Sequence, residues 1–143
     1  MTEKIYISWS DFHQHVKLLA EQIKSSTKDF KQIVAVSRGG LLPAGILSYE
    51  LNIRNCELIN VSSYDDSKQR SDKDVEIISK SMNYGAETLI VDDLADSGRT
   101  VKMLKNLYPS ASFACVYAKP QGREIADFQT ISLPDKWVVF PWD

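Results

Sequence analysis

The sequence predicts an α/β fold in which a central, mostly parallel β-sheet is flanked by helices. Short apolar runs rich in β-branched residues alternate along the chain with segments whose apolar residues recur at helical spacing. Several of these runs end in polar or glycine-containing loops that lead into the next helical segment, as in open parallel sheets. At 143 residues, 43% of them hydrophobic, the chain is expected to form a single domain over residues 1–143.

The predicted elements follow from spacing and from helix start signals. Ser8 or Ser10 is expected to cap a helix over residues 11–25, and a second helix over 41–51 has Pro43 in its first turn. A third helix is expected over residues 101–107. Buried strands are predicted at residues 32–36, 56–62, 88–91 and 112–118, and residues 130–133 and 137–143 are expected to form an aromatic-rich tail.

The stretch from Glu87 to Val101 carries the first functional signal. Asp92 and Asp93 follow the predicted strand, and the loop from Asp96 to Thr100 leads into the third helix. Backbone N–H groups and the helix dipole at such a junction favour an anion. Because two carboxylates beside a phosphate repel it, a cation or a hydroxylated ligand is expected between them.

Two other strand ends carry polar groups. The loop Ser37-Arg38-Gly39-Gly40 combines a fixed positive charge with glycines that permit close approach of a ligand, although it could also be a plain strand–helix connection. Lys119 follows the predicted strand 112–118. Since ligands bind outside the carboxyl ends of parallel strands, these groups and Asp92/Asp93 are expected to converge on one crevice.

Composition narrows the function classes. The net charge of −2 argues against binding to nucleic acid or to an anionic membrane surface. The two cysteines, the absence of a signal-like start and the absence of a long apolar run suggest a cytoplasmic protein. The polar segment 63–80 is expected to be a lid loop, in which Tyr64 and Arg70 could cover an anionic ligand, or else a flexible loop or exposed hairpin.

Three kinds of site can follow a strand with an Asp-Asp ending. A nucleoside triphosphatase would need a Gly-x4-Gly-Lys-Ser/Thr loop, which the sequence lacks. An aspartyl-phosphate phosphatase would need an Asp-x-Asp spacing at the end of this strand, which Asp93 and Asp96 do not have. In the third kind, the vicinal carboxylates hold the two hydroxyls of a ribose whose phosphate lies in the following loop.

The third kind is the one that type I phosphoribosyltransferases use, and the sequence resembles that family, most closely the bacterial xanthine–guanine (6-oxopurine) enzymes. The resemblance covers nearly the whole chain, from about Ile5 to Asp143. Its motifs are Ile33-Val-Ala-Val-Ser-Arg-Gly-Gly-Leu41, Ile59-Asn-Val-Ser-Ser-Tyr64, Ile90-Val-Asp-Asp-Leu-Ala-Asp-Ser-Gly-Arg-Thr100, Ala118-Lys-Pro120, Gly122-Arg123 and Trp137-Val-Val-Phe-Pro-Trp-Asp143.

The resemblance implies a purine-salvage enzyme that makes a nucleoside 5′-monophosphate and pyrophosphate from a 6-oxopurine and 5-phosphoribosyl 1-pyrophosphate. It implies that Asp96 is the catalytic base, and that Asp92 and Asp93 hold the ribose hydroxyls and Mg²⁺. The other implied roles are the 5′-phosphate cradle of Ser97, Gly98, Arg99 and Thr100; the pyrophosphate site of Ser37, Arg38, Gly39 and Arg70; the lid residues Ser63 and Tyr64; and the purine site of Lys119, Trp137 and Val138.

The family pattern adds further expectations. A non-proline cis peptide is expected at the Arg38–Gly39 turn, a small hood is expected over residues 119–143, and the enzyme is expected to form a homodimer or homotetramer. Arg99 stands where the xanthine–guanine enzymes carry a small residue, and Val139 stands where they carry an acid near the purine 2-substituent. The alternative is a regulator of the same fold that senses phosphoribosyl pyrophosphate and binds nucleic acid.

Overall fold

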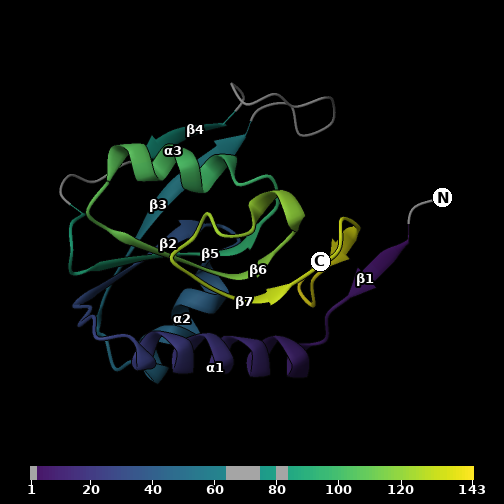
Figure 1. Cartoon of the computed structure of the whole chain (residues 1–143), viewed down its shortest axis with the longest axis horizontal. Helices are drawn as coiled ribbons and strands as arrows, with labels where there is room; N and C mark the ends of the chain where they lie inside the picture. The colour runs from purple at the N-terminus through teal and green to yellow at the C-terminus, as the bar shows by residue number, and fades with distance from the viewer. Residues whose placement is uncertain (1–2, 64–74, 80–83) are drawn as a thin grey trace.

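A computed structural model describes residues 3–63, 75–79 and 84–143, and its centre is a six-stranded sheet in the order β4-β3-β2-β5-β6-β7. Five of these strands are parallel, and β4 pairs antiparallel with β3 at one edge. The predicted α/β fold with a mostly parallel sheet is therefore confirmed (Figure 1). The strands are β2 (Gln32–Ser37), β3 (Asn55–Ser63), β4 (Val75–Ser79), β5 (Thr88–Ala95), β6 (Ser112–Ala118) and β7 (Phe128–Ser132).

Helices cover both faces of the sheet. Helices α1 (Trp9–Ser25) and α2 (Leu41–Glu50) lie on one face, and α3 (Arg99–Leu107) lies on the other (Figure 1). Side chains that alternate along β2 enter different cores: Ile33 and Ala35 join the α1/α2 side, whereas Val34 and Val36 join the α3 side. A strand buried on both faces reads as a continuous apolar run, which is why these strands were predictable.

The N-terminal helix begins where its cap predicts. The Ser8 side chain accepts a hydrogen bond from the Asp11 amide at 3.0 Å, so α1 starts at Trp9, two residues before the predicted start. None of the helices in the described ranges has the length and apolarity needed to span a lipid bilayer.

Other boundaries also differ from the predictions. Strand β5 continues through the aspartates to Ala95, because its ladder with β6 extends to the pair Ala95 and Ala118. Helix α3 begins at Arg99 instead of residue 101. The predicted lid segment 63–80 contains strand β4, and it begins at the last residue of β3; residues 64–74 and 80–83 lie outside the described residues.

A second, two-stranded sheet joins the ends of the chain. Strand β1 (Lys4–Tyr6) pairs parallel with β8 (Trp137–Val139), and Lys4 lies opposite Trp137. A short 3₁₀ turn over Pro120–Gly122 follows β6 and starts the C-terminal segment. Strand β1 was not predicted, because pairing between segments so far apart in the chain leaves no local signal.

Candidate functional site

A small hollow lies at the carboxyl end of β5, where the strand turns into α3. Its volume is about 80 Å³. Its lining is continuous in sequence except for Asp93 and comprises Asp92, Leu94, Ala95, Asp96, Ser97, Gly98, Arg99, Thr100 and Val101. The loop predicted to hold a phosphate therefore forms a phosphate-sized concavity at a helix N-terminus.

Gly98 determines the shape of this loop. It precedes α3 with a φ of +88°, a left-handed conformation that favours glycine. A Cβ there would also overlap the Ile125 side chain. The N-cap residue of α3 is Gly98, which has no side chain that could cap the helix. The Arg99 amide donates a hydrogen bond to Ser97 Oγ at 3.3 Å. The first amides of an α-helix have no partner within the helix, so this turn suits an anion.

The two adjacent aspartates differ in position although they are neighbours in sequence. Because successive strand residues point to opposite faces, Asp92 lines the hollow on the α3 side, whereas Asp93 lies beside Gly39. The Asp93 amide donates to Asp92 Oδ1 at 2.8 Å, and the Leu94 amide donates to Asp93 Oδ1 at 2.7 Å. Both carboxylates are partly buried near the carboxyl end of β5.

Burial disfavours the charged forms of these two carboxyl groups. Desolvation, together with the charge of Asp93, raises the pKa of Asp92 well above its ordinary value, and desolvation also raises the pKa of Asp93. Burial and the same two carboxylates raise the pKa of the Cys115 thiol, which lies opposite Asp92 on β6. In the described part of the chain neither aspartate forms an ion pair with lysine or arginine.

This donor set fits Mg²⁺. Hard oxygen ligands suit the ion, and it is commonly held by one or two carboxylates together with substrate oxygens. Within the described ranges, no group of three or more histidine, cysteine, aspartate and glutamate side chains is placed to bind a metal alone. Asp92 and Asp93 would therefore hold Mg²⁺ only together with a ligand that brings its own oxygens.

The loop after β2 lies against the second aspartate. A Cβ on Gly39 would lie 2.6 Å from Asp93 Oδ1, so only glycine allows the backbone this close to the carboxylate. The cis peptide of this loop joins Ser37 to Arg38, one bond before the expected position. Arg38 is exposed, and the Gly40 amide donates to the Val36 carbonyl at 2.7 Å. The two predicted anion loops therefore lie next to each other at the carboxyl end of the parallel strands.

Lys119 forms an ion pair with Asp96, in the loop between β5 and α3. Its Nζ lies 3.5 Å from Asp96 Oδ2, and the Lys119 side chain is 10% exposed against 65% for Asp96. The Lys119 amide donates to the Ala95 carbonyl at 3.0 Å, and Gly122 lies so close to that carbonyl that a Cβ would collide with it. The predicted convergence of strand ends is therefore observed.

The remaining predicted purine residues lie on the hood. Val138 is buried with the α1/α2 core, whereas Trp137 is 63% exposed. The Tyr117 hydroxyl and His15 Nδ1 are 2.8 Å apart, and the Tyr117 ring contacts Phe140, which anchors the hood to α1.

Some of the predicted site residues lie outside the residues that the structure describes. One residue that acts on the site was not predicted. Tyr64 and Arg70 belong to the first group, together with the side chain of Ser63. The unpredicted residue is Asp143: its negative charge contributes to the raised pKa of Asp93. No pattern in the sequence could have linked the last residue to β5, because that proximity comes from tertiary packing.

The geometry supports a specific kind of chemistry. The hollow can bind a phosphate, the adjacent carboxylates can bind a metal ion or sugar hydroxyls, and Lys119 can donate a hydrogen bond beside Asp96. These groups therefore suit a phosphorylated sugar in contact with a second reactant that carries an oxygen acceptor and an acidic proton.

Comparisons with known proteins agree with this geometry. The phosphoribosyl transferase domain model matches residues 6–143. The chain is 43% identical over 141 residues to the xanthine-guanine phosphoribosyltransferase of Idiomarina loihiensis, a match that covers 98% of this chain and 87% of that protein.

Two solved structures share the fold at full length. The purine phosphoribosyltransferase of Pyrococcus horikoshii is 28% identical with a TM-score of 0.77, and the match covers 98% of this chain and 93% of that one. The xanthine-guanine-hypoxanthine phosphoribosyltransferase of Helicobacter pylori is 25% identical with a TM-score of 0.73, over 98% and 94% of the two chains.

Proposed function

This chain belongs to the phosphoribosyl transferase family and is a phosphoribosyltransferase, and from that premise we propose that its substrates are a 6-oxopurine and 5-phosphoribosyl 1-pyrophosphate. The products are the purine nucleoside 5′-monophosphate and pyrophosphate. The relatives named for purine substrates, which match nearly the full chain, support this assignment.

The observation that carries the proposal is the contact between Lys119 and Asp96. Lys119 comes from the end of β6 and Asp96 from the loop after β5, yet their charged atoms lie 3.5 Å apart at the hollow. A hydrogen-bond donor and a proton acceptor at that spacing match two neighbouring atoms of a 6-oxopurine, the 6-oxygen and N7. Because the Asp96 side chain is 65% exposed, solvent weakens its attraction to Lys119, so a ligand can separate the two groups at small cost.

The sugar-phosphate half of the substrate would be held by the β5–α3 segment. Backbone amides and hydroxyls of Ser97, Gly98, Arg99 and Thr100 would bind the 5′-phosphate. Asp92 and Asp93 would bind the ribose hydroxyls and Mg²⁺, which neutralises charge on the pyrophosphate when it is bound. The transition state is oxocarbenium-like, so the carboxylates beside the ribose stabilise its developing positive charge.

The leaving group and the base would occupy the two neighbouring loops. The loop of Ser37, Arg38 and Gly39 would hold the pyrophosphate as its bond to ribose C1 breaks. The purine N9 forms the new bond to ribose C1. Asp96 accepts the proton that N7 loses.

The hood would complete the base pocket. Trp137 would stack on the purine, and the backbone of Val138 would contact its edge. Lys119 would select 6-oxopurines because the 6-amino group of adenine cannot accept its hydrogen bond. Val139 offers no carboxylate to the 2-amino group of guanine, so this position does not favour guanine over hypoxanthine or xanthine.

The proposal also covers assembly and location. We infer a cytoplasmic enzyme that works as a homodimer or homotetramer, consistent with its role in salvage. The rest of the expected pyrophosphate site and lid, at Ser63, Tyr64 and Arg70, remains a sequence prediction.

The direct test is a base panel. The protein would be incubated with Mg²⁺, phosphoribosyl pyrophosphate and one of guanine, xanthine, hypoxanthine or adenine, and nucleotide formation measured. Product is expected from at least one 6-oxopurine and not from adenine. Absence of product with every base would refute the function, and efficient use of adenine would refute the role of Lys119.

The role of Asp96 is tested by Asp96→Asn. Because the amide cannot accept the purine proton, kcat is expected to fall on the order of 100-fold or more while substrate binding changes little. A variant that keeps near wild-type kcat would show that Asp96 is not the base.

A further inference from the structure

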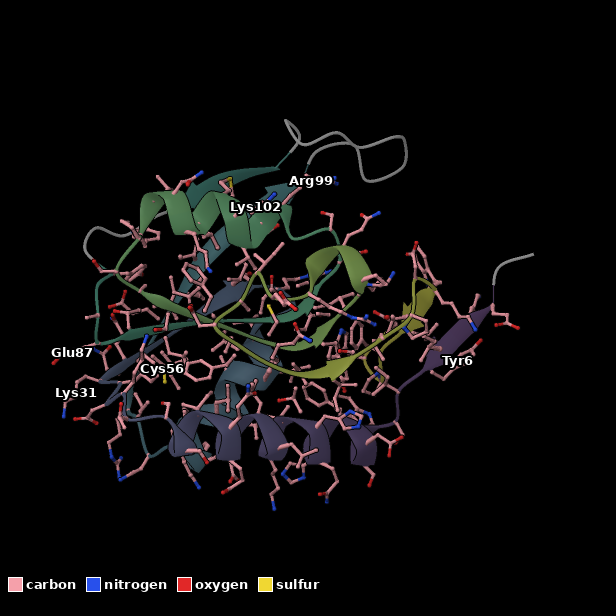
Figure 2. The ribbon with its side chains drawn as sticks, viewed as in Figure 1. Tyr6, Lys31, Cys56, Glu87, Arg99 and Lys102 are labelled. Carbon is pink, nitrogen blue, oxygen red and sulfur yellow. The ribbon has the colours of Figure 1, made fainter. Side chains whose placement is uncertain are left out.

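Strand β8 carries two of the proposed base contacts, Trp137 and Val138, yet it has little strand structure to hold it in place. Among the described strands it pairs only with β1, and a sheet of two strands is marginally stable by itself. Figure 2 shows Tyr6 of β1 at the margin of the molecule, where it is 70% exposed. The position of β8 must therefore depend on the contacts beneath this small sheet.

Aromatic rings that follow β8 supply some of these contacts. Phe140 and Trp142 stack with their ring centroids 4.8 Å apart and their planes within 3° of each other. The Trp142 ring also lies 5.0 Å from the ring of Phe12, which is buried on α1. Burial of apolar rings is favourable but non-directional, so these contacts hold the segment against α1 without defining one position for it.

Tyr117 adds a directional contact to the same group of rings. Its ring centroid lies 5.7 Å from that of Phe140, and its hydroxyl lies 2.8 Å from Nδ1 of His15 on α1. Tyr117 is fully buried, and this burial raises the pKa of its hydroxyl, which therefore keeps its proton at neutral pH. Because a hydrogen bond weakens steeply when its geometry is distorted, this one favours a single position of the Tyr117 ring.

The backbone of Tyr117 belongs to the strand that presents Lys119. Tyr117 lies two residues before Lys119, and on β6 it is opposite Leu94 of β5 and Ile131 of β7. The strand therefore fixes the backbone at this point from both sides. One residue thus connects the strand that ends at the proposed donor to the 6-oxygen with Phe140, the residue directly after β8.

We propose that Tyr117 is a positioning residue, which sets the separation of Lys119 and β8 through its hydrogen bond to His15 and its contact with Phe140. The inference rests on the proposed function, because it assumes that the purine binds between Lys119 and Trp137. Tyr117 acts through Phe140 and contacts no substrate. It therefore controls the affinity for the base, whereas the sugar-phosphate site and the proton acceptor remain as they are.

Tyr117→Phe tests the proposal, since it removes the hydroxyl and keeps the ring. The KM for the base should rise roughly five- to tenfold, the factor that corresponds to one hydrogen bond. The KM for phosphoribosyl pyrophosphate and kcat should stay within about twofold of wild type, because a loss of base binding alone does not alter them.

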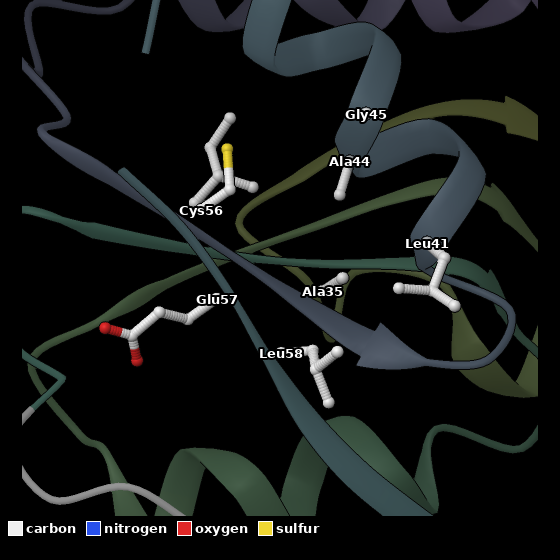
Figure 3. Close-up of a pocket in the computed structure, with 8 residues that line it drawn as sticks. Ala35, Leu41, Ala44, Gly45, Cys56, Glu57 and Leu58 are labelled. Atoms are coloured by element: carbon white, nitrogen blue, oxygen red, sulfur yellow. The ribbon is translucent and has the colours of Figure 1, made fainter. Parts of the chain in front are cut away.

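Tyr84→Phe is the matched control. Tyr84 is also buried, and its hydroxyl donates to Glu57 Oε1 at 2.9 Å. Glu57 lines an apolar cavity of about 510 Å³ between α2 and β3 (Figure 3), and β2 and β5 separate β3 from β6 in the sheet. Both variants lose a hydrogen bond of a buried tyrosine, so both should lower Tm by about 2–5 °C. Only Tyr117→Phe should raise the KM for the base.

Substitutions of His15 test whether the hydrogen bond itself is responsible. His15→Asn places an amide near the position of Nδ1 and should retain most of the affinity for the base. His15→Leu should raise the KM for the base at least as much as Tyr117→Phe, because it removes the partner of a buried hydroxyl. Since both changes remove the same bond, the double variant Tyr117→Phe/His15→Leu should not exceed the larger single effect.

Hydrogen–deuterium exchange of the free protein measures the position of the segment without substrate. Amides of residues 137–143 should exchange faster in Tyr117→Phe than in wild type, and Tyr84→Phe should leave them unchanged. A wild type that is inactive with every base would refute the proposed function. With an active wild type, three results would each overturn the role of Tyr117 alone: unchanged exchange in Tyr117→Phe, a rise in KM that is equal for both substrates, or an equal rise in the KM for the base in Tyr84→Phe.

Discussion

Replacing Gly39 by alanine should damage the proposed site through the position of one carboxylate. The added Cβ would lie 2.6 Å from Asp93 Oδ1 and 2.7 Å from its Cγ and Oδ2. Ordinary carbon contacts lie near 3.5 Å, so Asp93 or the loop must move by roughly 1 Å. A displacement of that size in a group that positions substrate can cost on the order of 100-fold in rate.

The assay is kcat/KM for phosphoribosyl pyrophosphate at saturating Mg²⁺ and base. Gly85→Ala is the control, because nothing lies within 4 Å of a Cβ at Gly85 and it precedes β5, at the opposite end of this strand from the site. The control should keep wild-type kinetics, whereas Gly39→Ala should lose about 100-fold with only a modest fall in Tm. Kinetics within a few-fold of wild type in a folded Gly39→Ala protein would refute the idea that this close approach positions Asp93.

Three other substitutions test separate parts of the site. Asp92→Asn should raise Tm at neutral pH, because the raised pKa of Asp92 means that its ionised form destabilises the free fold; the gain should vanish as the pH falls below the range in which Asp92 protonates, and a pH-independent gain would contradict this. Gly98→Ala should lower stability by about 1–3 kcal/mol in chemical denaturation, because φ is +88° and the Cβ meets Ile125, and an unchanged midpoint would argue against that strain. Lys119→Met should reduce the preference for hypoxanthine over adenine in kcat/KM by on the order of 10–100-fold, and an unaltered ratio would remove Lys119 from base selection.

The folding of local segments was predictable because short-range chemistry decides it. The run Ser112–Ala118 was predicted and found with the same bounds, since a fully buried parallel strand has an unbroken apolar sequence. Ser8 caps α1 as expected because a serine side chain can bond the amide three residues later. The position of the polar loop Asp96–Thr100 between a strand and a helix was likewise predictable, and this loop lines the hollow at the start of α3.

Boundaries that depend on a neighbour were predicted less well. Strand β5 extends beyond Val91 because β6 offers it a ladder as far as Ala118, and no residue of β5 signals that length. Strand β1 forms because Lys4 lies beside Trp137, at the far end of the chain. In both cases the partner supplies the hydrogen bonds, so the evidence for the strand lies elsewhere in the sequence.

The sequence by itself determined the fold class, the family and the chemical types at the site: an Asp-Asp strand end, two anion loops and one lysine. The tertiary structure alone decided that Gly39 lies against Asp93 and that Lys119 reaches Asp96 within 3.5 Å. The physical reason is the separation in sequence over which each kind of interaction acts. Propensity and periodicity act between neighbours in the chain, whereas these contacts join different strands through the register and packing of the whole sheet.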